Sequence, residues 1–128
     1  MKKILIIEDH ADMRELLSWQ IELMGFTAVM AKLGEEGVAK ALSENPELII
    51  LDIMMPGMDG WEVAKQIRAH PEMQNVPILA ATALFRDGDL KHCLDAGCNG
   101  YIVKPFTFQE LQVKVREFIP TASASFAR

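Results

Sequence analysis

The 128-residue chain carries 18 acidic against 13 basic side chains, for a net charge of −5, and half of its residues are hydrophobic. This length and composition predict one globular domain and leave no room for a second one. The acidic balance, without a cluster of basic residues, argues against direct binding of nucleic acid. The apolar stretches are far shorter than the roughly 20 residues of a membrane span. Glu8 and Asp9 cut the first stretch too short for a signal peptide, so a cytoplasmic location is expected.

Five short apolar segments alternate with longer segments of helical spacing, which is typical of a parallel sheet with helices on both faces. Four of the five are near-continuous aliphatic or small-residue runs, as in strands buried on both faces, whereas 27–30 is weaker and suits an edge. Right-handed crossovers then give a doubly wound α/β fold, whose ligand site lies at the carboxyl ends of the strands. The expected strands are Ile4–Ile7, Thr27–Met30, Leu48–Leu51, Val76–Ala80 and Tyr101–Val103.

Five helices are expected after these strands. Gly25 ends the first helix, His70 and Pro71 end the third, and Gly97 ends the short fourth one. Residues 1–119 are expected to form the domain, and 120–128, which lack periodicity, to be a disordered tail or a truncated linker. The predicted apolar faces comprise Met13, Leu16, Leu17, Ile21 and Met24; Val38, Ala39 and Leu42; Trp61, Val63, Ala64 and Ile67; Leu90 and Leu94; and Phe108, Leu111, Val115 and Phe118.

Acidic residues follow two of the predicted strands directly. Glu8 and Asp9 come after the first strand, and Asp52 comes after the third. In a flavodoxin-like strand order these strands are neighbours about 4.8 Å apart, so three carboxylates converge and need a cation to stay ionised. Their oxygen ligands favour Mg²⁺. The alternative is that each acid only caps the following helix, which suits a single acid better than three.

Two further polar residues end the fourth and fifth strand regions. Thr82 and Lys104 would face the same crevice as the acids. A phosphoryl group on Asp52 would carry close to two negative charges, so it would need a cation on one side and donors on the other. Taken alone, Lys104 suits a solvated surface and Thr82 an ordinary strand end, so this alternative stays open.

From Lys3 to about Ile119 the chain resembles response-regulator receiver domains of two-component signalling, of the chemotaxis-receiver type. The resemblance implies a five-stranded parallel sheet of order 2-1-3-4-5, a Mg²⁺ cofactor, and a phosphorylation-controlled switch loaded by a histidine kinase, a phosphotransfer protein or an acyl phosphate. The motifs that carry it are Glu8-Asp9, Asp52-Ile-Met-Met-Pro-Gly-Met-Asp-Gly60, Thr82-Ala83 and Lys104-Pro105-Phe106.

The resemblance also implies roles at the metal. Asp9 and Asp52 would ligate Mg²⁺ directly, Glu8 would act through a coordinated water, and Met54 would lend its backbone carbonyl. Asp52 would be the phosphoacceptor.

Around the phosphoryl group, Lys104 would pair with one oxygen and Thr82 would donate a hydrogen bond to another. The Lys104-Pro105 peptide bond would be cis. Tyr101 would act with Thr82 as a switch, its ring moving inward when Thr82 moves toward the phosphoryl group. A tyrosine simply suited to a strand is the alternative.

Two other functions stay open. A Mg²⁺-dependent aspartyl-phosphate hydrolase would have a second acid two residues after the nucleophile, where this chain has Met54. A receiver-like interaction module that works without phosphorylation normally lacks one of the acids or the lysine, and this chain has them all. As catalysis, only self-phosphorylation and slow self-dephosphorylation are expected. The output is a downstream protein or a covalently linked effector domain.

Some residues are expected to be structural. Cys93 and Cys98 are expected to be reduced thiols, because a five-residue separation across a helix end is not a disulfide framework. Cys98, which stands where the resembled family usually has alanine, is expected to fill a small buried site. His10 is expected to be a solvated loop residue, and Trp61 to pack the third helix.

Overall fold

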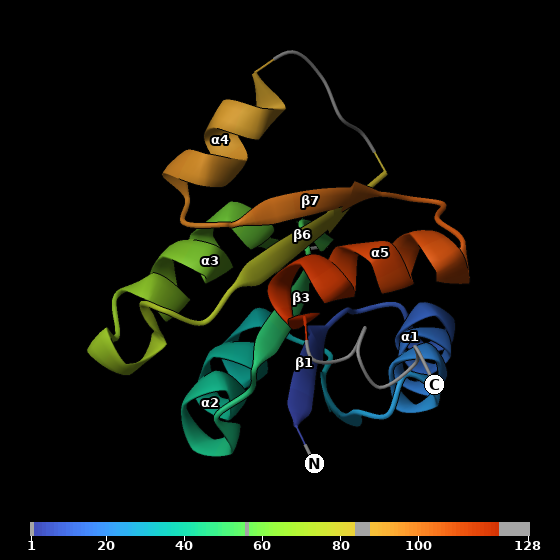
Figure 1. The fold of residues 1–128 in the computed structure, drawn as a ribbon. Coiled ribbons are helices and arrows are strands. Elements are labelled where there is room, and N and C mark those ends of the chain that lie inside the picture. Colours follow the sequence, from blue (N-terminus) through green and yellow to red (C-terminus); the bar gives the residue numbers. More distant parts are fainter. Residues whose placement is uncertain (1, 56, 84–87, 121–128) are drawn as a thin grey trace.

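The central element is a five-stranded parallel sheet of order β2-β1-β3-β6-β7 (Figure 1). The structure is a computed structural model and describes residues 2–55, 57–83 and 88–120. The α/β class and the predicted strand order are confirmed. The aliphatic run Ile4 to Ile7 is fully buried, as expected for a strand covered on both faces. The strands are β1 (Lys3–Ile7), β2 (Thr27–Ala31), β3 (Leu48–Asp52), β6 (Ile78–Thr82) and β7 (Gly100–Val103).

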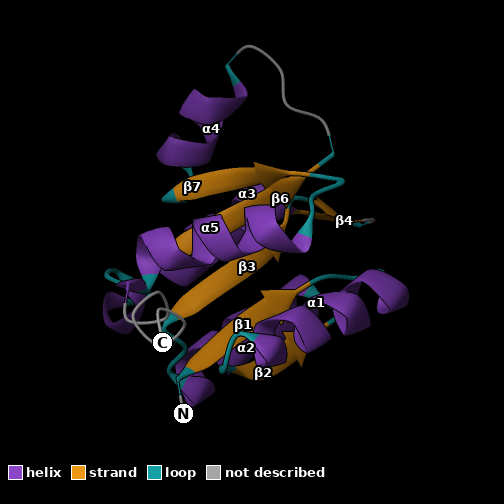
Figure 2. Ribbon diagram, turned by 45° about the vertical axis from the view of Figure 1, so that its right-hand side comes forward, coloured by secondary structure: helices purple, strands orange, loops and turns teal. Residues whose placement is uncertain are grey.

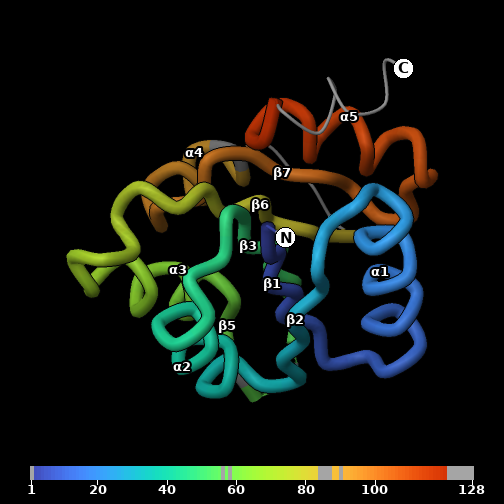
Figure 3. Tube along the Cα trace, turned by 60° about the horizontal axis from the view of Figure 1, so that its bottom comes forward, coloured from blue at the N-terminus to red at the C-terminus, as the bar shows by residue number. Residues whose placement is uncertain are grey.

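Helices cover both faces of the sheet (Figures 2 and 3). The helices α1 (Ala11–Leu23) and α5 (Phe108–Phe118) pack on one face, and α2 (Gly34–Glu44) and α3 (Gly60–Arg68) on the other. The short α4 (Asp89–Asp95) contributes Cys93 to the same core as α2 and α3. Alternate residues of each strand enter opposite cores, as the two-residue period of a strand requires.

The strand register brings four strand ends to one edge of the sheet. Ile7 pairs with Leu51, and Asp52 pairs with Ala81 on the next strand. Thr82 in turn pairs with Val103 at the end of β7. The residues that follow these positions therefore lie together, where a parallel sheet places its ligand site.

A small hairpin that the sequence analysis did not predict follows β3. Its strands β4 (Met54–Met55) and β5 (Met58–Asp59) pair antiparallel. Gly57, in the left-handed region at φ +74°, serves the turn. The hairpin carries the chain from the sheet edge to the start of α3.

Four details of the predicted elements are wrong. Leu16, Ala39 and Leu94 were predicted to lie on the buried faces of their helices, but Leu16 and Leu94 are 45% and 53% exposed and Ala39 is exposed. The buried face of each helix passes through neighbouring positions. The fourth strand begins at Ile78 and not at Val76, because Pro77 has no N–H for a strand ladder. Leu90's side chain and residues 121–128 lie outside the described part of the chain. The buried residues at these stripes are Leu17 and Ile21, Ala41, and Cys93.

A 3₁₀ turn over Pro71–Met73 joins α3 to β6.

Within the described ranges, the helices are all too short or too polar to cross a bilayer.

Candidate functional site

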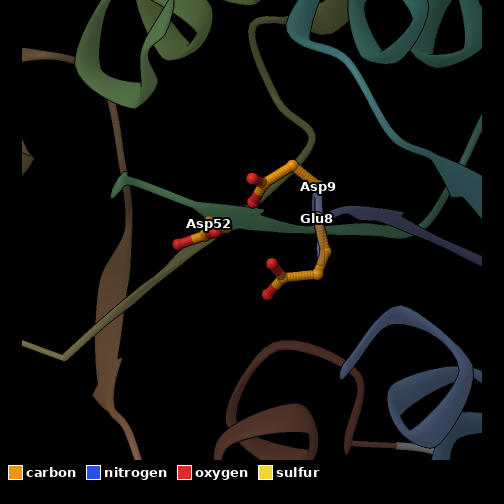
Figure 4. A group of neighbouring side chains, drawn as sticks. All are labelled: Glu8, Asp9 and Asp52. Atoms are coloured by element: carbon orange, nitrogen blue, oxygen red, sulfur yellow. The ribbon is translucent and has the colours of Figure 1, made fainter. Parts of the chain in front are cut away.

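Three carboxylates converge at the carboxyl ends of β1 and β3. Glu8, Asp9 and Asp52 each offer an oxygen, and these oxygens lie within 4.8 Å of one another. Figure 4 shows the three side chains turned toward a common space. Glu8 and Asp52 are only 1% and 5% exposed, and Asp9 is more open to solvent. The predicted convergence of the acids is therefore confirmed.

Lys104 extends its ammonium group into this cluster. Its Nζ lies 2.7 Å from Glu8 Oε1 and 3.4 Å from Asp52 Oδ1. The backbone places it there: Lys104 N–H donates to the Thr82 carbonyl at 2.8 Å, and the Lys104-Pro105 bond is cis, as predicted. A single lysine facing three acids leaves the cluster with an excess of negative charge.

The carboxyl of Asp52 has a raised pKa. Burial raises its pKa from 3.8 to about 7, and a hydrogen bond with Glu8 and the charge of Glu8 act in the same direction. The ammonium of Lys104 and the Met54 N–H, which donates to Asp52 Oδ1 at 3.2 Å, lower the pKa and offset only part of this. Near neutral pH the Asp52 carboxyl is therefore partly protonated, and further positive charge would favour its ionised form.

The loop after β1 is held by backbone contacts. Glu8 N–H donates to the Ala31 carbonyl at 3.0 Å, and Glu8 Oε2 accepts from His10 N–H at 3.2 Å. Arg14 Nη1 donates to the carbonyls of Glu8 at 3.0 Å and Asp9 at 3.3 Å. This role of Arg14 was not predicted from the sequence, in which its signal was a cation early in the helix that follows the acids.

His10 lies beside the acids but does not complete the cluster. It is exposed and is the N-cap of α1, and its Nδ1 accepts from Met13 N–H at 3.4 Å. Its exposure matches the prediction of a solvated residue.

Gly60 fixes the path of the chain from Asp52 to α3. A Cβ at Gly60 would lie 2.4 Å from the Ile53 Cα, so only glycine fits this close approach. Gly60 N–H donates to the Ile53 carbonyl at 3.0 Å. Asp59 then caps α3 by accepting from Trp61 N–H at 2.9 Å. The loop that follows Asp52 is thereby anchored at its far end.

Trp61 is half-buried and packs against the core under α3, as predicted. Its ring also stacks on His92 of α4, with centroids 4.6 Å apart.

The acids open onto a cleft of about 440 Å³. Met54, whose side chain is 56% exposed, and Ala83 form part of its wall. The cleft is therefore acidic at its base and partly apolar at its rim. The residues around it are Glu8, Asp9, His10, Met13, Asp52, Met54, Ala83 and Lys104.

Thr82 and Tyr101 lie on neighbouring strands. Thr82 ends β6 and is 5% exposed, and Tyr101 is half-buried on β7, where it pairs with Ala80. The Nζ of Lys114 on α5 lies 5.4 Å from the centre of the Tyr101 ring. Their predicted roles as a switch stay predictions.

The donors of the cluster suit a hard cation. All three side chains of the cluster offer carboxylate oxygens, and Glu8 and Asp52 are buried. The cluster contains no histidine or cysteine ligand. Oxygen ligands of this kind are those that Mg²⁺ prefers. The acidic cluster resembles the Mg²⁺ site of a receiver domain.

Comparison with known proteins decides the family. Residues 4–116 match the model of the response regulator receiver domain. The chain belongs to this family. Its acidic pocket, formed by Glu8, Asp9 and Asp52, is consistent with Mg²⁺-dependent phosphorylation of an aspartate.

Curated relatives of this receiver domain include transcriptional regulators. The chain is 40% identical over 121 residues to the transcriptional regulatory protein ResD of Bacillus subtilis, covering 94% of this chain and 49% of the relative. It is 38% identical over 118 residues to the alkaline phosphatase synthesis regulatory protein PhoP of the same organism, covering 92% of this chain and 48% of PhoP. The chain spans about half the length of the curated relatives it matches.

Solved receiver structures are close in fold. Chemotaxis protein CheY4 of Vibrio cholerae superposes with a TM-score of 0.89 at 29% identity, covering 92% of this chain and 98% of CheY4. The receiver domain of a sensor histidine kinase from Pseudomonas aeruginosa gives a TM-score of 0.85 at 31% identity, covering 93% and 98%. That domain was solved with a magnesium ion coordinated in its active site cleft.

Proposed function

We propose that Asp52 accepts a phosphoryl group in a reaction that requires Mg²⁺ at the acidic cluster. The position of Asp52 carries the proposal: it is a buried carboxyl, grouped with two other acids and 3.4 Å from the Lys104 ammonium. Its pKa of about 7 means that an arriving cation favours the ionised, nucleophilic form. Asp9, Asp52 and the Met54 carbonyl would hold the ion, with Glu8 acting through a coordinated water.

The chain's own residues then perform the transfer. When bound, Mg²⁺ neutralises the acids and polarises the oxygens of the incoming phosphoryl group. An Asp52 oxygen attacks the phosphorus of a phosphohistidine or a small acyl phosphate; the donor's P–N or P–O bond breaks, and an acyl phosphate forms on Asp52. Lys104 moves from Glu8 and Asp52 to a phosphoryl oxygen, and Thr82 donates to another.

The transfer serves signalling. New contacts of Thr82 and Lys104 with the phosphoryl group bias a two-state surface made by α4, β7 and α5, with Tyr101 as one moving part. The donor is a histidine kinase or a phosphotransfer protein. The curated relatives are named as transcriptional regulators about twice the length of this chain, which supports a covalently linked effector domain as the output.

The two alternative functions fit the site less well. In a hydrolase that forms a phosphoaspartate, a second acid would stand at the position of Met54, whose exposed side chain lines the cleft. A binding module that works without phosphorylation would have no use for a buried Glu8 and Asp52 grouped around one lysine. Burying such charges without a task costs stability.

Intact-mass spectrometry after incubation with acetyl phosphate tests the proposal. The protein should gain one phosphoryl group in Mg²⁺ and none in a chelator. Asp52→Asn should abolish the gain, because an amide is a far poorer nucleophile, while Asp59→Asn, which neutralises an exposed acid in the same loop, should label normally. An unchanged mass of the wild-type protein in Mg²⁺, or full labelling in chelator, would refute the proposal.

A further inference from the structure

The C-terminal end of α4 folds one cysteine back over another. Cys98 N–H donates to the Cys93 carbonyl at 3.0 Å, and Gly97 N–H donates to the Leu94 carbonyl at 3.0 Å. Gly97 has a φ of +100°, the left-handed conformation that this turn requires. Together these contacts form a Schellman motif, which brings its first and last residues into side-chain contact. Five residues apart in the sequence, the two cysteines are joined directly by a backbone hydrogen bond.

Both thiols are buried in the core under α4. Cys93 is 0% exposed and Cys98 is 4% exposed, and both are free. Cys93 Sγ donates to the Gly100 carbonyl at 3.5 Å. The thiol of Cys98 lowers the pKa of Cys93 against the opposing effect of burial, and the thiol of Cys93, together with burial, raises the pKa of Cys98. Schellman motifs frequently have an apolar pair at these two positions, whereas this chain has two cysteines there.

A guanidinium group is fixed beside the pair. Arg68 Nε donates to the Gly97 carbonyl at 2.9 Å, Nη2 donates to Asn99 Oδ1 at 2.7 Å, and Nη1 donates to the Met73 carbonyl. The thiol of Cys93 and burial raise the pKa of Cys98, and the positive charge of Arg68 offsets part of this rise. A cation beside a cysteine favours its reactive thiolate form.

We propose that Cys93 and Cys98 form a modification site, a dithiol that a hydroperoxide converts into an intramolecular disulfide across the end of α4. The thiolate of Cys93 attacks the peroxide, the O–O bond breaks, and a sulfenic acid and an alcohol (water from H₂O₂) form. Cys98 then attacks the Cys93 sulfur as a thiolate, a second water leaves, and the S–S bond closes. Two thiols are oxidised, one hydroperoxide is reduced, and a cytosolic thiol can reverse the change.

The two cysteines and the acidic cluster lie at opposite ends of the parallel strands. The turn that contains Cys98 leads into Gly100, which pairs with Leu79 at the start of β6 and β7. The acidic cluster lies at the other end of these strands, where Thr82 pairs with Val103. Oxidation therefore changes the end of α4 without touching the carboxylates. Because α4 belongs to the proposed signalling surface, the disulfide would act on output and leave acceptance of phosphate intact.

Local opening of α4 gives an oxidant access to the buried sulfurs. The helix has seven residues, and its N-cap, Gly88, makes no side-chain capping bond. A helix this short has little stability of its own, so its last turn can open without global unfolding. We expect oxidation to be slower than at an exposed thiol and to run to completion.

Treatment with hydrogen peroxide, followed by unfolding and alkylation with N-ethylmaleimide, tests the site. The wild-type protein should lose two hydrogen atoms in mass, take up no maleimide, and remain a monomer on a non-reducing gel. Dithiothreitol should restore two reactive thiols. Cys93→Ala and Cys98→Ala each keep one thiol and cannot close the bond, so neither should show the loss of two hydrogens.

The fold of the oxidised protein provides the second measurement. The disulfide should leave the circular dichroism spectrum unchanged and the melting temperature equal or higher, and acetyl phosphate should still add one phosphoryl group. Disulfide-linked dimers, thiols that stay reactive after peroxide, or a disulfide that forms only with loss of the folded spectrum would each overturn the proposal.

Discussion

Replacing Asp52 with asparagine should make the protein more stable near pH 8 in the absence of divalent metal. In the folded protein the Asp52 carboxyl gains its proton at about pH 7, whereas its ordinary pKa is 3.8. Between these values the folded state holds a proton that the unfolded state lacks, so the free energy of unfolding falls as the pH rises, and levels off above about 7. Asparagine at this position carries no charge and escapes this loss.

The size of the effect follows from the two pKa values. The two pKa values differ by about three, and a pKa difference of one corresponds to about 1.36 kcal/mol. The ionised Asp52 therefore lowers the free energy of unfolding by at most about 4 kcal/mol. The charge of Lys104, 3.4 Å from Asp52 Oδ1, already lowers this pKa, and a closer approach of the ammonium to the ionised carboxylate brings the expected gain below the ceiling. The asparagine amide can still donate to Glu8, so no buried partner is left without a hydrogen bond.

Urea unfolding in EDTA, followed by circular dichroism from about pH 4 to about pH 8, measures this difference. The free energy of unfolding of Asp52→Asn should exceed that of the wild type by an amount that grows as the pH rises. This difference should shrink toward pH 4. Asp59→Asn serves as the control, because it removes an exposed acid and keeps an asparagine cap on α3. Added Mg²⁺ should narrow or reverse the difference, since it stabilises the wild type more. If the Asp52 variant were no more stable than the wild type near pH 8 in chelator, the burial argument for Asp52 would be refuted.

Three further predictions concern the metal, the coupling and the lifetime of the phosphoryl group. Asp9→Asn should weaken Mg²⁺ binding in a titration of Trp61 fluorescence, because it removes a direct carboxylate ligand; equal affinity would place the metal elsewhere. Thr82→Ala should still accept a phosphoryl group, but the amide-shift changes should no longer extend through 101–111; an unchanged pattern would contradict the coupling route. Met54→Asn should speed loss of the phosphoryl group by roughly 10- to 100-fold, since the amide can orient a water that the thioether cannot; an unchanged decay rate would exclude this role.

The fold was predictable because its signals are local and repeated. The aliphatic runs ending in Asp52 and in Glu8 mark central strands and, at the same time, place the acids at the sheet edge. The buried stripes of the helices were less predictable. Leu16 and Leu94 suit a helical apolar pattern as well as their buried neighbours do, and only the packing of each helix on the sheet selects the inward position.

The contacts within the site could not be predicted from spacing. The 2.7 Å contact of Lys104 with Glu8 joins residues 96 apart, and it depends on the β7 register and on the turn after it. The carbonyl contacts of Arg14 depend on how α1 leaves the sheet edge. The cysteines show the same limit. Their separation gave no reason to expect contact, and the Schellman turn at Gly97 creates it.

Locating the acyl phosphate tests the central claim most directly. Protein loaded with acetyl phosphate in Mg²⁺ is reduced with borohydride, which converts a phosphorylated aspartate to homoserine, and is then sequenced by tandem mass spectrometry. The proposed chemistry predicts homoserine at position 52 alone. Homoserine at Asp9 or Asp59 with aspartate retained at 52, or no homoserine at any position, would contradict it.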